Sequence, residues 1–183
     1  MGTHIFVDPG FTATGLIVYG AEAKIINDFG CSIFDDKVRK ASNKKNGVTL
    51  TDLGRMQEIA TFLRKYRKRF PWVKALHMEI PGGSQSSRAA KTLGLVAGML
   101  TGWTKAIGLD VHFYTQGDVK LAVVGKEKGK QTSRRRSDLK PFVEAAVKER
   151  WKDLDWDTFP KYMNEHLYDA AGLIFAAETR GLI

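Results

Sequence analysis

Cysteine is almost absent from this sequence, and its scarcity excludes two ways of holding a fold together. Cys31 is the only cysteine among 183 residues. One thiol cannot form an internal disulfide, and it cannot build a zinc site that depends on several cysteines. We therefore expect a protein that rests on its hydrophobic core and works in a reducing compartment, the cytoplasm.

Long apolar runs are missing as well. The longest apolar helical segment, residues 93–104, falls short of the ~20 residues that a membrane-spanning helix needs. Asp8 interrupts the short apolar start, so no signal peptide is predicted. We expect no membrane partner and a single globular domain over residues 1–183, because 43% apolar and 27% charged residues are typical of such a domain.

Negative charge is in short supply. Lys and Arg number 29 against 20 Asp and Glu, which gives a formal net charge of +9. Such an excess favours an anionic partner, although a basic protein kept soluble by its lysines would have the same composition. Basic side chains are concentrated in residues 37–46, 64–69 and 120–140. We expect these stretches to form a basic surface that contacts nucleic-acid phosphates around the site described below.

The apolar pattern predicts a mixed α/β fold. Strands are predicted at residues 4–8, 13–19, 24–34, 74–79 and 110–114. Helices are predicted around residues 53–69, 84–107, 117–124, 138–151 and 161–179. Residues 37–49 and 125–137 are predicted to be loops, the second a mobile one. Three successive strands followed by alternating helices and strands indicate a mixed sheet flanked by helices.

Two of the predicted strands end in the same way, with a carboxylate followed by a Pro-Gly break. They read "IFVDPG", with Asp8 at the break, and "LHMEIPGG", with Glu79 there. A buried carboxylate is costly unless it is paired, hydrogen-bonded or bound to a metal. If the two strands are parallel neighbours, both carboxylates lie at the sheet edge where α/β proteins build their sites.

The last predicted helix supplies two more candidate ligands. His166 and Asp169 are three residues apart, so they share a helix face. With Asp8 and Glu79 they would form a site for Mg²⁺, which prefers oxygen ligands, or for Mn²⁺, which the imidazole favours. Two such ions about 3.5–4 Å apart can activate a water and stabilise the leaving oxygen of a phosphodiester. Taken singly, each residue also has a plain structural explanation, as a turn residue, an ion-pair partner, a surface histidine or a solvated carboxylate.

Four segments resemble, in order and spacing, the RuvC family of Holliday-junction resolvases. They read "VDPGFTATGLIVY", "HMEIPGGSQSSRAAKTLGLVAGML", "YTQGDVKLAVVGKEKGKQ" and "HLYDAAGLIFAA", and the match extends from residue 5 to about residue 177. The resemblance implies an α/β fold of the ribonuclease H-like kind. Its mixed five-stranded sheet would have three antiparallel strands, then parallel strands, and helices on its faces.

The resemblance also implies an activity and a set of residues. The protein would be a homodimeric, metal-dependent endonuclease that cleaves Holliday junctions and other branched DNA in recombination, repair or replication. Two Mg²⁺ or Mn²⁺ ions would be held by Asp8, Glu79, His166 and Asp169. The functional lysines that face the scissile phosphate would be Lys120 and Lys130, with Lys126 and Lys128 as competitors for the second position. Further DNA contacts would come from Lys126, Lys128, Arg134, Arg135 and Arg136.

One departure from the family pattern keeps other functions open. Residues 80–83 read Ile-Pro-Gly-Gly, where family members often carry an aromatic residue that helps to open the junction centre. A phage-type member with broader branched-DNA specificity would fit this divergence. The alternatives are a ribonuclease H-like nuclease that acts on RNA–DNA hybrids or other nucleic acid, and a junction-binding protein that does not cleave.

A glycine stripe in the long helix has two interpretations. Gly94, Gly98 and Gly102 recur at every fourth residue, and each costs roughly 1 kcal/mol relative to alanine inside a helix. Glycine allows close approach of another backbone, so the stripe would pack on the sheet, which we favour slightly, or form the two-fold contact of a dimer.

Overall fold

A five-stranded sheet forms the centre of the molecule. The computed structural model describes residues 2–10, 13–33, 50–80, 87–131 and 140–183. The strands are β1 (Thr3–Asp8), β2 (Ala13–Gly20), β3 (Ile25–Ile33), β4 (Val73–Glu79) and β5 (Asp110–Tyr114). The helices are α2 (Leu50–Arg69), α3 (Ser87–Ala106), α4 (Gln116–Gln131), α5 (Lys140–Arg150) and α6 (Lys161–Thr179).

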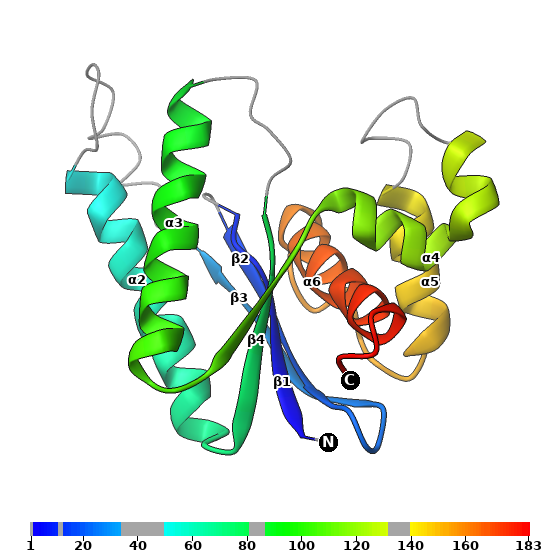
Figure 1. The fold of residues 1–183 in the computed structure, drawn as a ribbon, viewed down its shortest axis with the longest axis horizontal. Helices are drawn as coiled ribbons and strands as arrows, with labels where there is room; N and C mark the ends of the chain where they lie inside the picture. The colour runs from blue at the N-terminus through cyan, green and yellow to red at the C-terminus, as the bar shows by residue number, and fades with distance from the viewer. Residues whose placement is uncertain (1, 11–12, 34–49, 81–86, 132–139) are drawn as a thin grey trace.

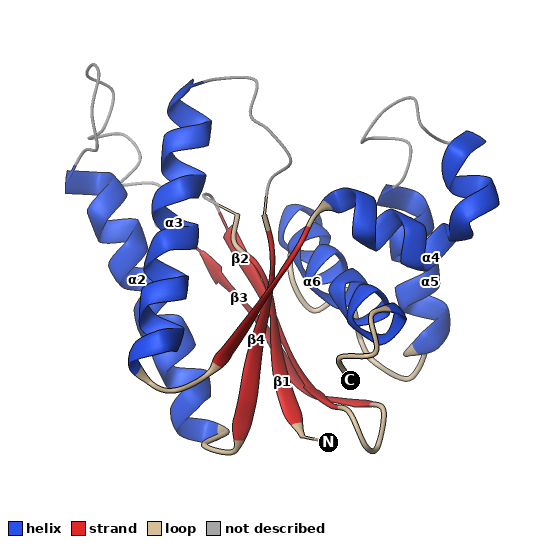
Figure 2. Ribbon diagram, in the orientation of Figure 1, coloured by secondary structure: helices blue, strands red, loops and turns tan. Residues whose placement is uncertain are grey.

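The strand order confirms the predicted mixed sheet. The strands lie side by side as β3-β2-β1-β4-β5. Strands β1 to β3 pair antiparallel, whereas β4 runs parallel to β1 and β5 runs parallel to β4. The central strand β1 is therefore paired on both sides, and its C-terminal end lies next to that of β4, as Figure 2 shows.

Helices cover both faces of the sheet. Helices α2 and α3 lie on one face, and α4, α5 and α6 lie on the other (Figure 1). Alternate residues of β1 serve the two layers: Ile5 and Val7 pack towards α2 and α3, while Phe6 packs towards α6. This double burial explains why three successive residues of β1, Ile5, Phe6 and Val7, are all apolar. Within the described part of the chain, no helix combines the length and the apolar character that crossing a membrane demands.

The prediction of a loop over residues 125–137 is wrong for the residues up to Gln131. Residues 125–131, predicted as loop, continue α4 past a break at Gly125, where φ is 79°. The segment lacks an apolar stripe, but Lys, Glu and Gln favour the helical backbone regardless of packing. The rest of that predicted loop, and the loop at 37–49, lie outside the described residues.

The glycine stripe of α3 does not pack on the sheet. Gly94, Gly98 and Gly102 are exposed, and a Cβ added at any of them would meet no described atom within 4 Å. Val96 and Leu100, on the opposite side of the helix, fill the core instead. The interpretation that we favoured from sequence is therefore wrong, because large apolar side chains decide which helix face is buried.

A polar row crosses the core beneath α6. His77 is fully buried on β4, with Nε2 2.8 Å from His4 Nδ1 on β1 and Nδ1 2.7 Å from the Tyr114 hydroxyl on β5. Burial, reinforced by His4 and His112 nearby, lowers the pKa of His77 to about 2. Burial also lowers the pKa of His4 to about 4 and raises the pKa of Tyr114 to about 12. This row therefore folds as neutral groups.

Acid is expected to destabilise the fold through this row. Below pH 6.5 the unfolded chain takes up protons on His4 and His77, whereas the folded protein does not until about pH 4 and about pH 2. The free energy of unfolding should fall by up to about 1.4 kcal/mol per pH unit for each imidazole between pH 6 and pH 5. Guanidinium denaturation at several pH values measures this slope.

A glutamine at position 77 isolates the contribution of one imidazole. The variant His77→Gln keeps hydrogen-bonding groups in the row but does not titrate, so its pH slope should be flatter by up to about 1.4 kcal/mol per unit. His166, whose raised pKa favours the folded state as the pH falls, is present in both proteins. Its effect therefore cancels when the slopes of wild type and variant are compared. Equal slopes for wild type and variant would contradict the assignment.

Candidate metal and nucleic-acid site

The ends of β1 and β4 place two carboxylates on one face of the sheet. Asp8 follows Val7, which pairs with Met78, the residue before Glu79. Side chains alternate along a strand, so Asp8 lies on the same face as Phe6, and Glu79 lies on the same face as His77. The stacked rings of Phe6 and His77 show that this is one face, the one that α6 covers. The predicted meeting of the two strand ends is confirmed.

Helix α6 lies close to the sheet because β2 has a glycine at the crossing point. A Cβ on Gly15 would overlap the backbone carbonyl of His166 and lie 2.9 Å from the amide nitrogen of Leu167. Gly10, after the Pro9 turn, leaves room for the imidazole of His166 in the same way. These two glycines allow the His166 turn of α6 to approach the end of β1.

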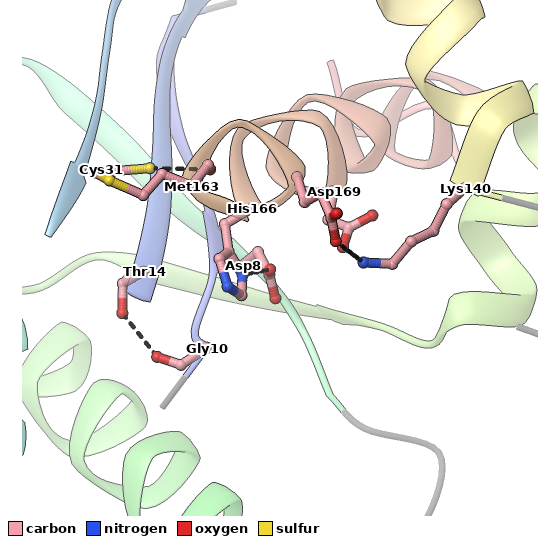
Figure 3. Close-up of polar contacts among 9 residues, drawn as sticks. Asp8, Gly10, Thr14, Cys31, Lys140, Met163, His166 and Asp169 are labelled. Atoms are coloured by element: carbon pink, nitrogen blue, oxygen red, sulfur yellow. Dashed lines mark hydrogen bonds and ion pairs between the residues drawn. The ribbon is translucent and has the colours of Figure 1, made fainter. Parts of the chain in front are cut away.

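Asp8 and His166 form a direct pair, shown in Figure 3. The distance from His166 Nδ1 to Asp8 Oδ2 is 2.6 Å, and both side chains are mostly buried. Burial acts to lower the pKa of His166, but the hydrogen bond and charge of Asp8, with the charge of Asp169, raise that pKa above its usual value. Asp8 therefore stabilises the protonated form of the imidazole, whose Nδ1–H donates a hydrogen bond to the Asp8 carboxylate.

Glu79 and Asp169 share a small hollow. The hollow has a volume of about 40 Å³ and is also lined by Gln116, Lys120 and Lys140. One water needs roughly 10–15 Å³, so the hollow admits a few waters or a small ion. Glu79, Asp169 and Lys120 therefore line one hollow, and their predicted roles there stay predictions.

Metal ligation remains a prediction. Among the residues that the structure describes, no three His, Cys, Asp or Glu side chains are gathered closely enough to hold a metal ion. The donor types nevertheless suit a hard divalent cation, because the Asp8–His166 pair and the hollow of Glu79 and Asp169 lie at neighbouring strand ends. His166 would ligate as the neutral imidazole, through the ring nitrogen that carries no proton.

The predicted basic residues fall into three groups. Lys120 lines the hollow. Lys126, Lys128 and Lys130 belong to the part of α4 beyond Gly125. Arg134, Arg135 and Arg136 lie outside the described residues, as do residues 37–46. The DNA contacts predicted for these arginines and for residues 37–46 therefore stay predictions.

The basic end of α2 does not surround the site, contrary to our expectation. Residues 64–69 end α2, and a short turn leads from Phe70 into Val73 at the start of β4. Glu79 stands at the far end of that strand. The stretch therefore lies at the opposite edge of the sheet, at the bottom of Figure 1.

Sequence reasoning gave Lys140 no role beyond its charge, yet it contacts the site. Its Nζ lies 2.7 Å from Glu165 Oε2 and 3.9 Å from Asp169 Oδ2 (Figure 3). A second hollow of about 510 Å³ opens on the far side of this lysine, between α5 and α6. No sequence signal links Lys140 to Asp169, because they sit on separate helices that meet only in the folded chain.

Comparison with solved structures identifies the fold. Thermus thermophilus RuvC in complex with a Holliday-junction substrate matches with a TM-score of 0.67 and 17% identity, over 99% of this chain and 95% of that one. Another structure of Thermus thermophilus RuvC matches with a TM-score of 0.66 and 18% identity, over 97% and 96%. No protein-family model and no curated protein matches the sequence. The chain has the ribonuclease H-like fold of RuvC.

Proposed function

We propose that this protein is a metal-dependent, structure-specific endonuclease that cleaves Holliday junctions and other branched DNA. The observation that carries the proposal is that Asp8, paired with His166, and Glu79, which shares a hollow with Asp169, end two neighbouring parallel strands. They do so in a chain whose fold follows RuvC over nearly its whole length. The Thermus protein was solved with a junction substrate, which supports branched DNA as the substrate class here.

The site residues would divide the work between cation and DNA. Two Mg²⁺ or Mn²⁺ ions would supply an activated water and stabilise the charge on the phosphate. Asp8, Glu79 and Asp169 would hold them through carboxylate oxygens, and His166 through a ring nitrogen of the neutral imidazole. Because Asp8 raises the pKa of His166, a bound cation would compete with a proton for that imidazole.

Lysines would hold the anionic substrate against this acidic site. Lys120 would contact the scissile phosphate, a role supported by its position in the same hollow as Glu79 and Asp169. Lys130 would face the same phosphate, with Lys126 and Lys128 as competitors for that position. Further DNA contacts would come from Lys126, Lys128, Arg134, Arg135 and Arg136. Such contacts weaken steeply with salt, because each releases counterions from the DNA.

A homodimer is part of the proposal. A two-fold dimer would present two sites to a junction that is itself two-fold symmetric. The exposed glycine face of α3 supports the dimer interpretation of the stripe, because it leaves a helix backbone open to close approach. The proposed biological setting is recombination, repair or the processing of replication intermediates in the cytoplasm.

A cleavage panel tests the proposed function. Four substrates that share one labelled strand are compared: a four-way junction, a flap, an RNA–DNA hybrid and a linear duplex. In Mg²⁺ or Mn²⁺ at low salt, we expect the junction to be cut at least about tenfold faster than the duplex, a difference of 1.4 kcal/mol in transition-state stabilisation. Chelation of the metal should abolish cleavage of every substrate.

The panel separates the alternatives by outcome. Preferential cutting of the hybrid would replace the proposal with a ribonuclease H-like activity. Tight junction binding without cutting in either metal would identify a junction-binding protein. Cleavage that persists with excess chelator would exclude the metal-dependent mechanism.

A further inference from the structure

Arg180, which caps the C-terminus of α6, holds the end of β5 and the start of α4. Its Nη1 donates a hydrogen bond to the Phe113 carbonyl at 2.9 Å, and its Nη2 lies 2.8 Å from Asp118 Oδ1. Its guanidinium also lies over the Tyr114 ring, 4.6 Å from the centroid. We call Arg180 with these three partners the Arg180 clamp. It ties α6 to the segment from which α4 begins.

Asp118 connects the clamp to the first turn of α4. The backbone nitrogen and the hydroxyl of Thr115 donate to Asp118 Oδ2, at 2.6 and 2.7 Å, and the Asp118 amide lies 3.3 Å from the Thr115 hydroxyl oxygen. This reciprocal arrangement is a capping box, which fixes where a helix starts. One carboxylate oxygen thus sets the start of α4, while the other is held by Arg180.

A second contact holds α4 against α6 one residue later. A Cβ on Gly172 of α6 would lie 3.0 Å from a methyl carbon of Val119, so the two helices already touch at van der Waals distance. The next residue is Lys120, which lines the hollow with Glu79 and Asp169. Since Asp169 also belongs to α6, one helix carries a candidate metal ligand together with the contacts that place the lysine beside it.

We infer that Arg180 is a positioning residue, which holds α4 so that Lys120 reaches the phosphate bound at Glu79 and Asp169. This inference rests on the proposed endonuclease function. Arg180 itself does not touch the substrate, and it acts through Lys120. A displacement of about 1 Å at a reacting group can cost roughly a hundredfold in rate. Loss of the clamp should therefore lower the cleavage rate.

A double-mutant cycle tests the inference. The single-turnover rate of junction cleavage is measured for wild type, R180M, K120M and the double variant. R180M should slow cleavage about tenfold, with the dissociation constant for the junction changed less than about twofold. If Arg180 acts through Lys120, the double variant should be no slower than K120M alone, because the clamp has nothing left to position. R180K, which keeps the charge but loses the planar fork, should restore part of the rate.

Arg150 supplies a matched control. It makes a bidentate pair with Glu178 on α6 at 2.6 Å and donates a hydrogen bond to the Tyr19 hydroxyl. Its guanidinium lies over the rings of Trp151 and Phe175, and none of these partners belongs to α4. R150M should therefore lower the free energy of unfolding more than R180M does. Any effect of R150M on the cleavage rate should be independent of Lys120, so that the effects of R150M and K120M add. D118N breaks the same ion pair as R180M and serves in the cycle if R180M does not fold.

The outcomes distinguish the positioning role of Arg180 from the proposed endonuclease function. Cleavage by wild type with additive effects of R180M and K120M would overturn the positioning role alone. A junction affinity that falls along with the rate in R180M would also overturn it, because the clamp would then act on binding. Absence of cleavage by wild type on every branched substrate would overturn the proposed function, and the positioning role with it.

Discussion

Replacement of Asp8 by asparagine is expected to lower the cleavage rate roughly a thousandfold, the upper end of what loss of one transition-state contact costs. Asparagine keeps the size of the side chain and can still accept the hydrogen bond from His166 Nδ1, now 2.6 Å away from the carboxylate. It removes the negative charge that a divalent cation needs. The fold should therefore survive, and junction binding should be unchanged or tighter, because a like charge near the phosphates is gone.

The same variant has a readout that does not depend on cleavage. The hydrogen bond and charge of Asp8 are what raise the pKa of His166 against the effect of burial. In Asp8→Asn that pKa should fall, which an NMR titration of the imidazole measures. A pKa that does not move would show that Asp8 and His166 are not paired in solution.

Asp28→Asn is the matched control for this experiment. Asp28 is a strand carboxylate on β3 that pairs with Arg69 at the end of α2, away from the site. Its substitution should change the cleavage rate less than twofold, because no contact of the site is altered. Cleavage by Asp8→Asn within about tenfold of wild type would remove Asp8 from the catalytic site.

Local sequence signals were sufficient where they mark the end of a strand. The carboxylate and Pro-Gly pattern at Asp8 and Glu79 marked the ends of β1 and β4. The three-residue spacing of His166 and Asp169 placed both on the side of α6 that faces these ends. Such features depend on neighbouring residues, so a single sequence carries them.

The contacts that complete the site depend on residues distant in the sequence. The pairing of Asp8 with His166 requires α6 to cross β2 at Gly15, and no local pattern announces which glycine lies under a helix. Lys140 meets Asp169 only because α5 packs on α6. Which face of α3 is buried likewise depends on packing in the whole fold. Val96 and Leu100 fill the core, and the glycines on the opposite face stay exposed.

Gly15→Ala is expected to damage both stability and cleavage. The added methyl group would overlap the His166 carbonyl and lie 2.9 Å from the Leu167 amide, and both are helix backbone that cannot rotate away. Overpacking of this kind typically costs about 1–3 kcal/mol. Because α6 has to move away from β2 at His166, the Asp8–His166 pair should lengthen, and cleavage should fall well beyond the loss of folded protein. Chemical denaturation and single-turnover cleavage measure the two effects.

Gly54→Ala is the opposing control, because it adds the same methyl group where there is room for it. Gly54 lies within α2, and a Cβ there meets no described atom within 4 Å. Alanine favours a helix interior by roughly 1 kcal/mol over glycine, so this variant should be stabilised and should cleave at the wild-type rate. The opposite signs would show that close approach of α6, rather than glycine content, determines the effect at position 15. A Gly15→Ala protein as stable and active as wild type would mean that the helix does not need this gap, and that another contact places His166 beside Asp8.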